Sequence, residues 1–433
     1  MTEVAVSASQ CPQQSPAQVS RAPRPVRAVV AASFGNALEW FDNVIYGFFA
    51  LTIARQFFPT HDPNVSLLIA FGTFGASFFF RPLGGVVIGA YADRAGRKAA
   101  LLLTMMLMLI GTATIAFMPP YSSIGITAPI LVVVARVIQG FSAGGEFGSA
   151  TAFLAEQSPG RRAFYSSWQF ASQGLTTLLA AAFGVAIETA LTVDQVHSWG
   201  WRIPFFFGLL IGPVALYIRR HVDESPEFRS AEPNRNPLAD AMRSQKLRML
   251  IGLGAVVLAT VTSYTLLYMP TYAVRHLGLA ASDGFCATLT AGAILFLLTP
   301  VAGLAADRYG RLAITVPCAM LLTMAPVPLF AWMADAASSE TLFVSQALIA
   351  CLSAGYLGGL PAFLTELFPV GNRSTGVSLS YNLSVAMFGG LAPFTITWLI
   401  ATTGSIAAPG YYLAAAGLFS LAALAAARRL GHR

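Results

Sequence analysis

Apolar stretches recur along the chain from Val29 to the C-terminus, each about 18 to 30 residues long and separated from the next by a short polar segment. A helix of about 20 residues crosses the roughly 30 Å of hydrocarbon in a bilayer. In lipid, only helices and closed barrels satisfy every backbone N–H and C=O, and these stretches lack the alternation of apolar and polar residues that barrel strands show. The pattern therefore predicts an all-α membrane protein.

The spacing of the stretches predicts twelve transmembrane helices in two sets of six. We expect an N-terminal six-helix bundle at 28–220 and a C-terminal six-helix bundle at 249–433, joined by a polar, proline-containing cytoplasmic linker at 221–248. Residues 1–27 are rich in Ser, Gln and Pro and predict a disordered cytoplasmic tail. The expected spans are 28–57, 65–92, 99–118, 129–157, 163–190, 201–220, 249–274, 282–306, 312–334, 341–368, 374–400 and 409–428.

Charge supports the membrane interpretation and orients the chain. Only 10% of the 433 residues are charged, against roughly 25% in an average soluble domain. The formal net charge of +7 comes from Lys and Arg in the short loops of one side, whereas the opposite loops contain only Arg202 and Arg275, with Arg55 near a span end. Positively charged loops stay in the cytoplasm, so both termini and the linker should be cytoplasmic. Scattered basic residues of this kind do not indicate a nucleic-acid partner.

An internal repeat relates the two halves. Gly89, Asp93, Arg94, Gly96 and Arg97 stand in a loop string that recurs 214 residues later, with Asp307, Arg308 and Arg311 at the matching positions. A second pair of strings, 152–156 and 362–366, repeats at an offset of 210. Two halves related by an axis along the membrane normal would produce such pairs. An acid at a helix end followed by a glycine turn and a basic cluster can join two bundles and part again, so we interpret both loops as gating motifs.

These loop strings resemble those of the major facilitator superfamily. Narrower strings at 35–42, 81–85 and 136–144 resemble its metabolite:proton symporter family, and those at 164–169 and 199–206 are most similar to bacterial citrate and tricarballylate carriers. The sequence departs from the family at two positions, where Asn43 replaces a usual aromatic residue and Leu312 a usual basic one. The resemblance implies two pseudo-symmetric six-helix bundles, a monomer in a bacterial inner membrane, and proton-coupled symport of a small organic anion.

Ionisable residues inside the spans are the candidates for function, because a charge at the bilayer centre is costly unless it faces a partner or a water-filled cavity. Glu39 and Arg81 should lie near the midplane, and a polar face of the first span contains Asn43 and Tyr46 with Asp42 beside it. Further polar faces contain Arg136 and Glu146 in span four and Gln169 and Gln173 in span five. The second half offers neutral donors, which are Tyr264, Tyr268, Tyr381 and Asn382. We expect these faces to line a central cavity.

The resulting hypothesis assigns substrate and proton to different groups. Arg81 and Arg136 would bind a carboxylate of citrate or a related di- or tricarboxylate, because a guanidinium can hold a carboxylate bidentately. Glu39, Asp42 and Glu146 are the candidates for proton coupling, since carboxyl groups in a poorly solvated cavity protonate more easily. A permanent structural ion pair of Arg136 with Glu146 or another acid is the alternative for that arginine.

Three other kinds of function compete with this hypothesis: a symporter of another metabolite, a membrane enzyme and a non-transporting sensor. A symporter of a zwitterionic osmolyte, a shikimate-like compound or an aromatic acid would use the same scaffold. A membrane enzyme lacks support, because the sequence contains no hydrolase or nucleotide-binding motif. A non-transporting sensor would ordinarily carry an output domain after the last span. No cofactor or metal is expected, because the four cysteines lack metal-ligand spacing and the five histidines lie near span ends or outside the spans.

Overall fold

The computed structural model describes residues 25–95, 97–156, 160–213, 245–369 and 373–431. Within these ranges, the side chains of some helical residues, Glu39 and Glu146 among them, lie outside the description. The described residues form helices and connecting turns without a strand. Most of the expected tail at 1–27 and of the expected linker at 221–248 falls outside the described residues. The division into bundles at those boundaries therefore stays a prediction.

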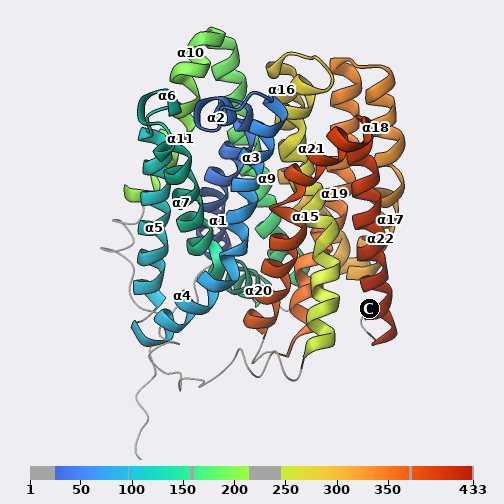
Figure 1. Ribbon diagram of the computed structural model, residues 1–433. Coiled ribbons are helices and arrows are strands. Elements are labelled where there is room, and N and C mark those ends of the chain that lie inside the picture. Colours follow the sequence, from blue (N-terminus) through green and yellow to red (C-terminus); the bar gives the residue numbers. More distant parts are fainter. Residues whose placement is uncertain (1–24, 96, 157–159, 214–244, 370–372, 432–433) are drawn as a thin grey trace, which may run out of the picture.

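The N-terminal half contributes six helical spans (Figure 1), several of them broken into two helices. The elements are α1 (Pro25–Phe48), α2 (Ala50–Phe57), α3 (Pro63–Phe79), α4 (Arg81–Ala95), α5 (Arg97–Phe117), α6 (Tyr121–Ile124), α7 (Thr127–Ser142), a 3₁₀ turn η1 (Ala143–Gly145), α8 (Glu146–Glu156), α9 (Arg162–Ala190), α10 (Val193–Ser198), η2 (Gly200–Arg202) and α11 (Ile203–Gly208).

The C-terminal half repeats the arrangement with longer continuous helices. Its elements are α15 (Lys246–Arg275), α16 (Ala281–Tyr309), α17 (Arg311–Met324), α18 (Pro326–Asp335), α19 (Ser339–Leu367), α20 (Arg373–Ser384), a π-helical turn η4 (Val385–Gly389), α21 (Ala392–Thr403) and α22 (Ala408–Arg429). Apart from the end of span six, which lies outside the described residues, every expected span begins and ends within three residues of the observed helices. The apolar pattern thus located eleven of the twelve spans from end to end, together with the start of the sixth.

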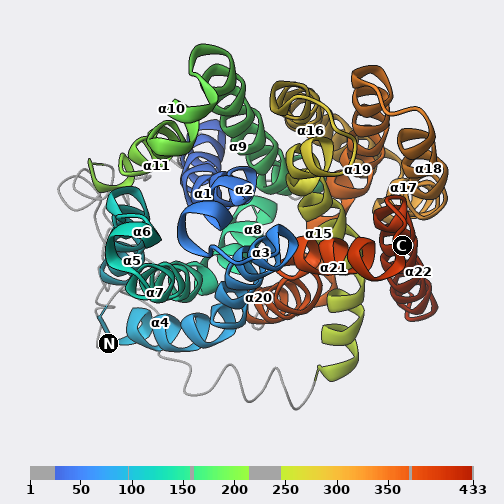
Figure 2. The ribbon, with the colours of Figure 1, turned by 45° about the horizontal axis from the view of Figure 1, so that its top comes forward.

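Eight of the described spans are long and apolar enough to cross a bilayer as continuous segments, and shorter apolar helices cover 102–117 and 127–142. The two sets of helices lie side by side, with α1 to α11 on one side and α15 to α22 on the other (Figure 2). The halves meet where α9 packs along α16, α3 along α21, α8 along α20 and α1 along α15. The architecture is an all-α membrane fold of two similar six-helix bundles.

Glycines allow the backbones of span two and span four to approach closely. A Cβ on Gly140 would lie 1.8 Å from the carbonyl oxygen of Ser77, and one on Gly144 would lie 1.9 Å from that of Arg81. On the other side of the contact, a Cβ on Gly84 would lie 1.8 Å from the carbonyl oxygen of Phe141. No side chain fits in these gaps, so the glycines fix α7 against the α3–α4 break. This packing brings the segments that contain Arg81 and Arg136 together.

The two ends of the bundle are named here after a residue at each. The Asp307 end is where α16, α19 and α22 finish and α9 begins, in the lower part of Figure 1. The Arg275 end is the opposite one, where α15 finishes and α3 begins. At the Asp307 end, Gly310 has a φ of +103° between α16 and α17, a conformation that residues with a Cβ rarely adopt. The tight glycine turn predicted after Asp307 is therefore present.

Candidate functional site

Arg136 lies near the middle of span four, is fully buried and donates two hydrogen bonds. Its Nη1 donates to Gln139 Oε1 at 2.7 Å, and its Nη2 donates to Asn43 Oδ1 at 2.8 Å. The guanidinium also lies over the ring of Tyr46 at 4.6 Å from the ring centroid. Neutral amides and aromatic faces therefore surround this cation, while its Nε has no described partner.

The hydrogen bonds continue from Arg136 to a buried acid. Gln139 Nε2 donates to Thr112 Oγ1 at 3.0 Å, and Thr112 Oγ1 donates in turn to Asp42 Oδ2. The other carboxylate oxygen of Asp42 has no described donor, although the residue is only 2% exposed. We call these five residues (Arg136, Asn43, Gln139, Thr112 and Asp42) the Arg136 network. It connects spans one, three and four and links one cation to one carboxylate through an unbroken chain of hydrogen bonds.

Gly208 of α11 covers the free oxygen of Asp42. A Cβ on Gly208 would lie 2.5 Å from Asp42 Oδ1, which is closer than a methyl group can approach without displacing it. Span six therefore approaches this carboxylate with its backbone at Gly208.

Arg81 lies at the break between α3 and α4 and is 2% exposed. Its guanidinium lies over two aromatic rings, at 4.5 Å from the centroid of Phe78 and 5.2 Å from that of Trp40. Both rings contact Tyr264 of α15, so the group lies at the boundary between the halves. Among the side chains that the structure describes, no carboxylate lies within ion-pair distance of Arg81, and its Nε has no hydrogen-bond partner.

The other N-half residues predicted for the site form contacts between helices. Gln169 exchanges hydrogen bonds with Asn36, because its Nε2 donates to Asn36 Oδ1 at 2.9 Å and its carbonyl oxygen accepts from Asn36 Nδ2 at 3.0 Å. Tyr46 donates to the carbonyl of Ala70 at 3.3 Å and supplies a ring to Arg136. Gln173 on α9 has an Nε2 without a described partner. Tyr46 is thus next to the Arg136 network, whereas Gln169 joins α1 to α9.

The predicted C-half residues lie at three different levels. Tyr264 packs its ring against Trp40, Phe74 and Phe78, near Arg81. Tyr268 lies one turn closer to the Arg275 end and hydrogen-bonds Thr397 and His276. Tyr381 stacks on Phe147 of the other half, and Asn382 donates to the carbonyl of Gly144 at 2.8 Å. Tyr264 of this set contacts both aromatic rings that lie against the guanidinium of Arg81.

Several predicted residues cannot be placed as side chains. Glu39 and Glu146 lie on α1 and α8, but their side chains are outside the described part of the structure, and the same holds for the N-half gating motif (Gly89, Asp93, Arg94, Gly96 and Arg97). The permanent ion pair considered for Arg136 has no counterpart among the described side chains, since its described partners are amides.

The C-half gating motif joins the two halves at the Asp307 end. Asp307 accepts hydrogen bonds from the backbone N–H groups of Ala163 and Phe164, both at 2.9 Å, at the start of α9. Glu366 of α19 pairs with Arg311 at 2.8 Å and with Arg162 at 3.9 Å. A carboxylate at a helix N-terminus meets unpaired N–H groups and the positive end of the helix dipole. We call these six residues the Asp307 cluster. Arg308, also in the predicted motif, is exposed and lies over the ring of Tyr309.

Described contacts join the two halves at both ends of the bundle in this conformation. The Asp307 cluster joins the halves at one end, and at the other Arg275 of α15 donates to Asn64 of α3 at 2.8 Å. Between them, Arg81, Asp42, Asn43 and Arg136 are each at most 4% exposed. These members of the polar faces predicted to line a cavity are therefore packed between helices here.

Sequence reasoning missed several contributors. Thr112 and Gly208 are a small polar residue and a glycine inside apolar stretches, and no pattern distinguishes them from packing residues. Of the rings around Arg81, Trp40 stands in the string at 35–42, and Phe78 belongs to no motif. Their role follows from the break at Phe80, which turns the arginine toward Trp40 and Phe78.

Comparison with known proteins identifies the class. The model of the sugar (and other) transporter family matches residues 28–242 and 229–427, and the chain belongs to this family. The citrate-proton symporter of Klebsiella pneumoniae is 37% identical over 403 residues, which cover 92% of this chain and 90% of that protein. The glycine betaine/proline/ectoine/pipecolic acid transporter of Dickeya dadantii is 35% identical and covers 89% of this chain and 80% of its own length.

Solved structures show the same fold at low sequence identity. The xylose transporter of E. coli, in a partially occluded inward-open conformation, superposes with a TM-score of 0.73 at 16% identity and covers 94% of this chain and 97% of its own. A D-xylose-proton symporter gives the same TM-score at 17% identity, with 92% and 97% covered. The protein is thus a multi-pass membrane transporter of the major facilitator superfamily, and not an enzyme.

Proposed function

We propose that this protein is a secondary active symporter that carries a small organic anion, citrate or a related di- or tricarboxylate, together with protons. The observation that carries the proposal is the buried guanidinium of Arg81, which no described carboxylate neutralises. The described side chains around it add a second cation, Arg136, and a single acid, Asp42. A buried positive charge without a counter-ion is costly, and a substrate carboxylate would complete the site.

Asp42 is the group we propose for proton coupling among the described acids. One of its oxygens accepts from Thr112, and the other has no described donor and could receive a proton. Protonation would neutralise Asp42, the one carboxylate of the Arg136 network, and would leave the positive charge of Arg136 available to an anion. Glu39 and Glu146 stay candidates from the sequence alone. Loading of anion and proton would thus support each other through one hydrogen-bonded chain.

The transport cycle would alternate between the two closures seen here. Breaking the Asp307 cluster would open one side of the central site, and breaking the Arg275–Asn64 contact would open the other. Since both halves of the site come from one chain, a monomer suffices. We further propose a bacterial inner-membrane location with the Asp307 end and both termini in the cytoplasm, because the basic loops lie at that end. A reporter that fluoresces only in the cytoplasm should be active when fused after Arg433.

A zwitterionic osmolyte is the second candidate, because the relatives include osmolyte transporters at up to 35% identity. Aromatic rings commonly bind quaternary ammonium groups. Here, however, the rings of Trp40 and Phe78 already lie against the guanidinium of Arg81, and Tyr46 lies against Arg136. A substrate cation would have to displace a protein cation from its own aromatic partners. This arrangement favours an anion.

Uptake into proteoliposomes tests the proposal. Radiolabelled citrate should accumulate when the outside is acidified, and a proton ionophore should abolish the accumulation. Arg81→Gln should lower citrate uptake at least tenfold, whereas the matched change Arg55→Gln, in an arginine whose one described hydrogen bond is to His197, should leave it within twofold. Competition by unlabelled di- and tricarboxylates, but not by betaine, is expected. Inhibition by betaine alone, or full uptake by Arg81→Gln, would refute the anion assignment.

A further inference from the structure

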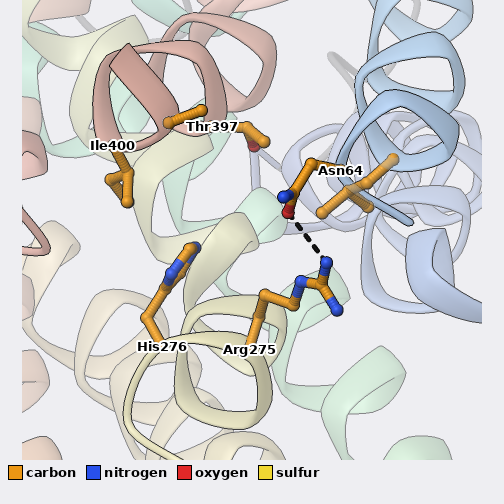
Figure 3. A pocket seen from close by; sticks show the side chains of 7 residues that line it. Asn64, Arg275, His276, Thr397 and Ile400 are labelled. Carbon is orange, nitrogen blue, oxygen red and sulfur yellow. Dashed lines mark hydrogen bonds between the residues drawn. The ribbon is translucent and has the colours of Figure 1, made fainter. Parts of the chain in front are cut away.

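A cavity of about 230 Å³ lies at the Arg275 end, between the two halves (Figure 3). Asn64 and Leu67 of α3 form its N-half wall, and the remaining lining comes from the C-half: Arg275, His276, Thr397, Ile400 and Ala401. None of the lining residues belongs to the Arg136 network, so the cavity is separate from that network. Its position between the halves means that its walls move apart when this end opens.

Arg275 provides the charge of this cavity. Its Nη2 donates to Asn64 Oδ1 at 2.8 Å, and no described carboxylate lies within ion-pair distance of the guanidinium. Figure 3 shows the two side chains pointing toward each other across the boundary between the halves. The acceptor is a neutral amide, which binds a guanidinium more weakly than a carboxylate does. The contact that closes this end is therefore one that an anion can replace.

The other polar residues of the wall, Asn64, His276 and Thr397, are neutral. Tyr268 links His276 to Thr397, with 3.1 Å between its hydroxyl and His276 Nε2 and 3.2 Å between its hydroxyl and Thr397 Oγ1. Burial, together with the neighbouring Arg275 charge, lowers the pKa of His276 to about 4, so its ring is uncharged near neutral pH. The wall thus presents one positive charge and groups that can form hydrogen bonds beside it, with Leu67 and Ile400 as apolar edges.

We propose that this cavity is an outer binding site where a carboxylate of the arriving substrate pairs with Arg275 and displaces Asn64. The guanidinium can bind the carboxylate bidentately, and the amide of Asn64 is released when it does. Arrival of the anion therefore removes the contact between α3 and α15 that keeps this end closed. Substrate binding at the surface favours opening toward the deeper arginines, because the anion binds the state in which Arg275 is free. The inference rests on the proposed anion transport.

Three variants separate a binding role from a purely structural one. Arg275→Gln should raise the KM for citrate about tenfold, the loss expected for one charge-assisted contact, with Vmax within twofold, and Arg275→Lys should recover part of it. Asn64→Ala should not raise KM, because it only frees the guanidinium. Asn64→Asp should raise KM, because it supplies a competing carboxylate. Equal KM values for Arg275→Gln and Asn64→Ala would show that the pair only closes this end and would overturn the proposal.

A second measurement does not depend on transport. With the four natural cysteines replaced by alanine, Ile400→Cys places a thiol in the cavity wall, and citrate should slow or speed its reaction with a membrane-impermeant maleimide. The response should need about tenfold more citrate in Arg275→Gln. A wild-type protein that shows this response but accumulates no citrate would retain the cavity site and refute the transport proposal. Accumulation without any response of the thiol would refute the cavity site alone.

Anionic lipid is the other source of a negative group at this depth. The uptake measurements are therefore repeated in liposomes of zwitterionic lipid with and without phosphatidylglycerol. For a substrate site, the KM of the parent protein should be the same in both. A KM that rises with phosphatidylglycerol in the parent but not in Arg275→Gln would assign the cavity to a lipid phosphate and overturn the substrate assignment.

Discussion

Neutralising Asp307 should open the Asp307 end of the transporter. The carboxylate accepts two backbone hydrogen bonds at 2.9 Å from the start of α9, and its side chain is only 9% exposed. Hydrogen bonds to a charged group each contribute about 1.5–3 kcal/mol and neutral ones about 0.5–1.5 kcal/mol. Asp307→Asn replaces two charge-assisted hydrogen bonds by one neutral bond, so at the lower ends of these ranges the loss is about 2 kcal/mol. That corresponds to a roughly 30-fold shift toward the open state.

Thiol accessibility measures this shift. Ser167 on α9 is fully buried against Gly303 of α16, at the boundary between the halves. In a variant without the four natural cysteines, Ser167→Cys should react with a membrane-impermeant maleimide only when this end opens, so its rate reports the open fraction. Adding Asp307→Asn should raise the rate about 30-fold, within a factor of three.

Arg308 provides the matched control, since it is the next residue of the same motif. It is exposed and contacts only the ring of Tyr309 among the described side chains, so Arg308→Gln should change the rate less than twofold. A rate unchanged by Asp307→Asn, or raised equally by Arg308→Gln, would refute the assignment of the closure to the carboxylate and its contact with α9.

Three further predictions concern the rest of the structure. Gly208→Ala places a methyl group 2.5 Å from Asp42 Oδ1, so it should cost about 1–3 kcal/mol of stability and change the pH profile of uptake. Asn43→Asp gives Arg136 a permanent ion pair and should raise the KM for citrate at least tenfold. Burial lowers the pKa of His276 to about 4, so between pH 6.5 and pH 4 the unfolded chain binds a proton that the folded protein does not, and stability falls as the pH drops through this range. His276→Gln should therefore flatten the fall in Tm over that range.

Each has its own control or contrary outcome. Gly160→Ala, at a position with nothing within 4 Å of the added methyl, should leave both stability and the uptake profile unchanged. If Asn43→Asp transported citrate with the parent KM, Arg136 would not bind the substrate. A Tm that falls equally steeply with acid in His276→Gln and the parent would assign the acid sensitivity to other groups.

How far the sequence predicts the site depends on the kind of residue. The depth of Arg81 and Arg136 follows from counting along a helix, because 1.5 Å per residue within a span of known length leaves little freedom. Which groups face these arginines does not follow, because rotation of each helix and the breaks at Phe80 and Ala143 decide it. Asn43 shows the difference. Its position on a polar face was predictable, whereas its bond to Arg136 needed the packing of α1 against α7.

The apolar pattern by itself determined that the chain crosses a membrane in twelve helices and that the halves repeat, since backbone satisfaction in lipid permits few other solutions. The repeated loop string located the acid and the glycine turn of the Asp307 motif. Tertiary structure alone decided that Asp307 meets the N-terminus of α9, that a threonine connects Asp42 to Gln139, and that Arg275 faces Asn64 across a cavity. These contacts join helices distant in sequence, and helix rotation and crossing, which fix them, leave no periodic trace in the chain.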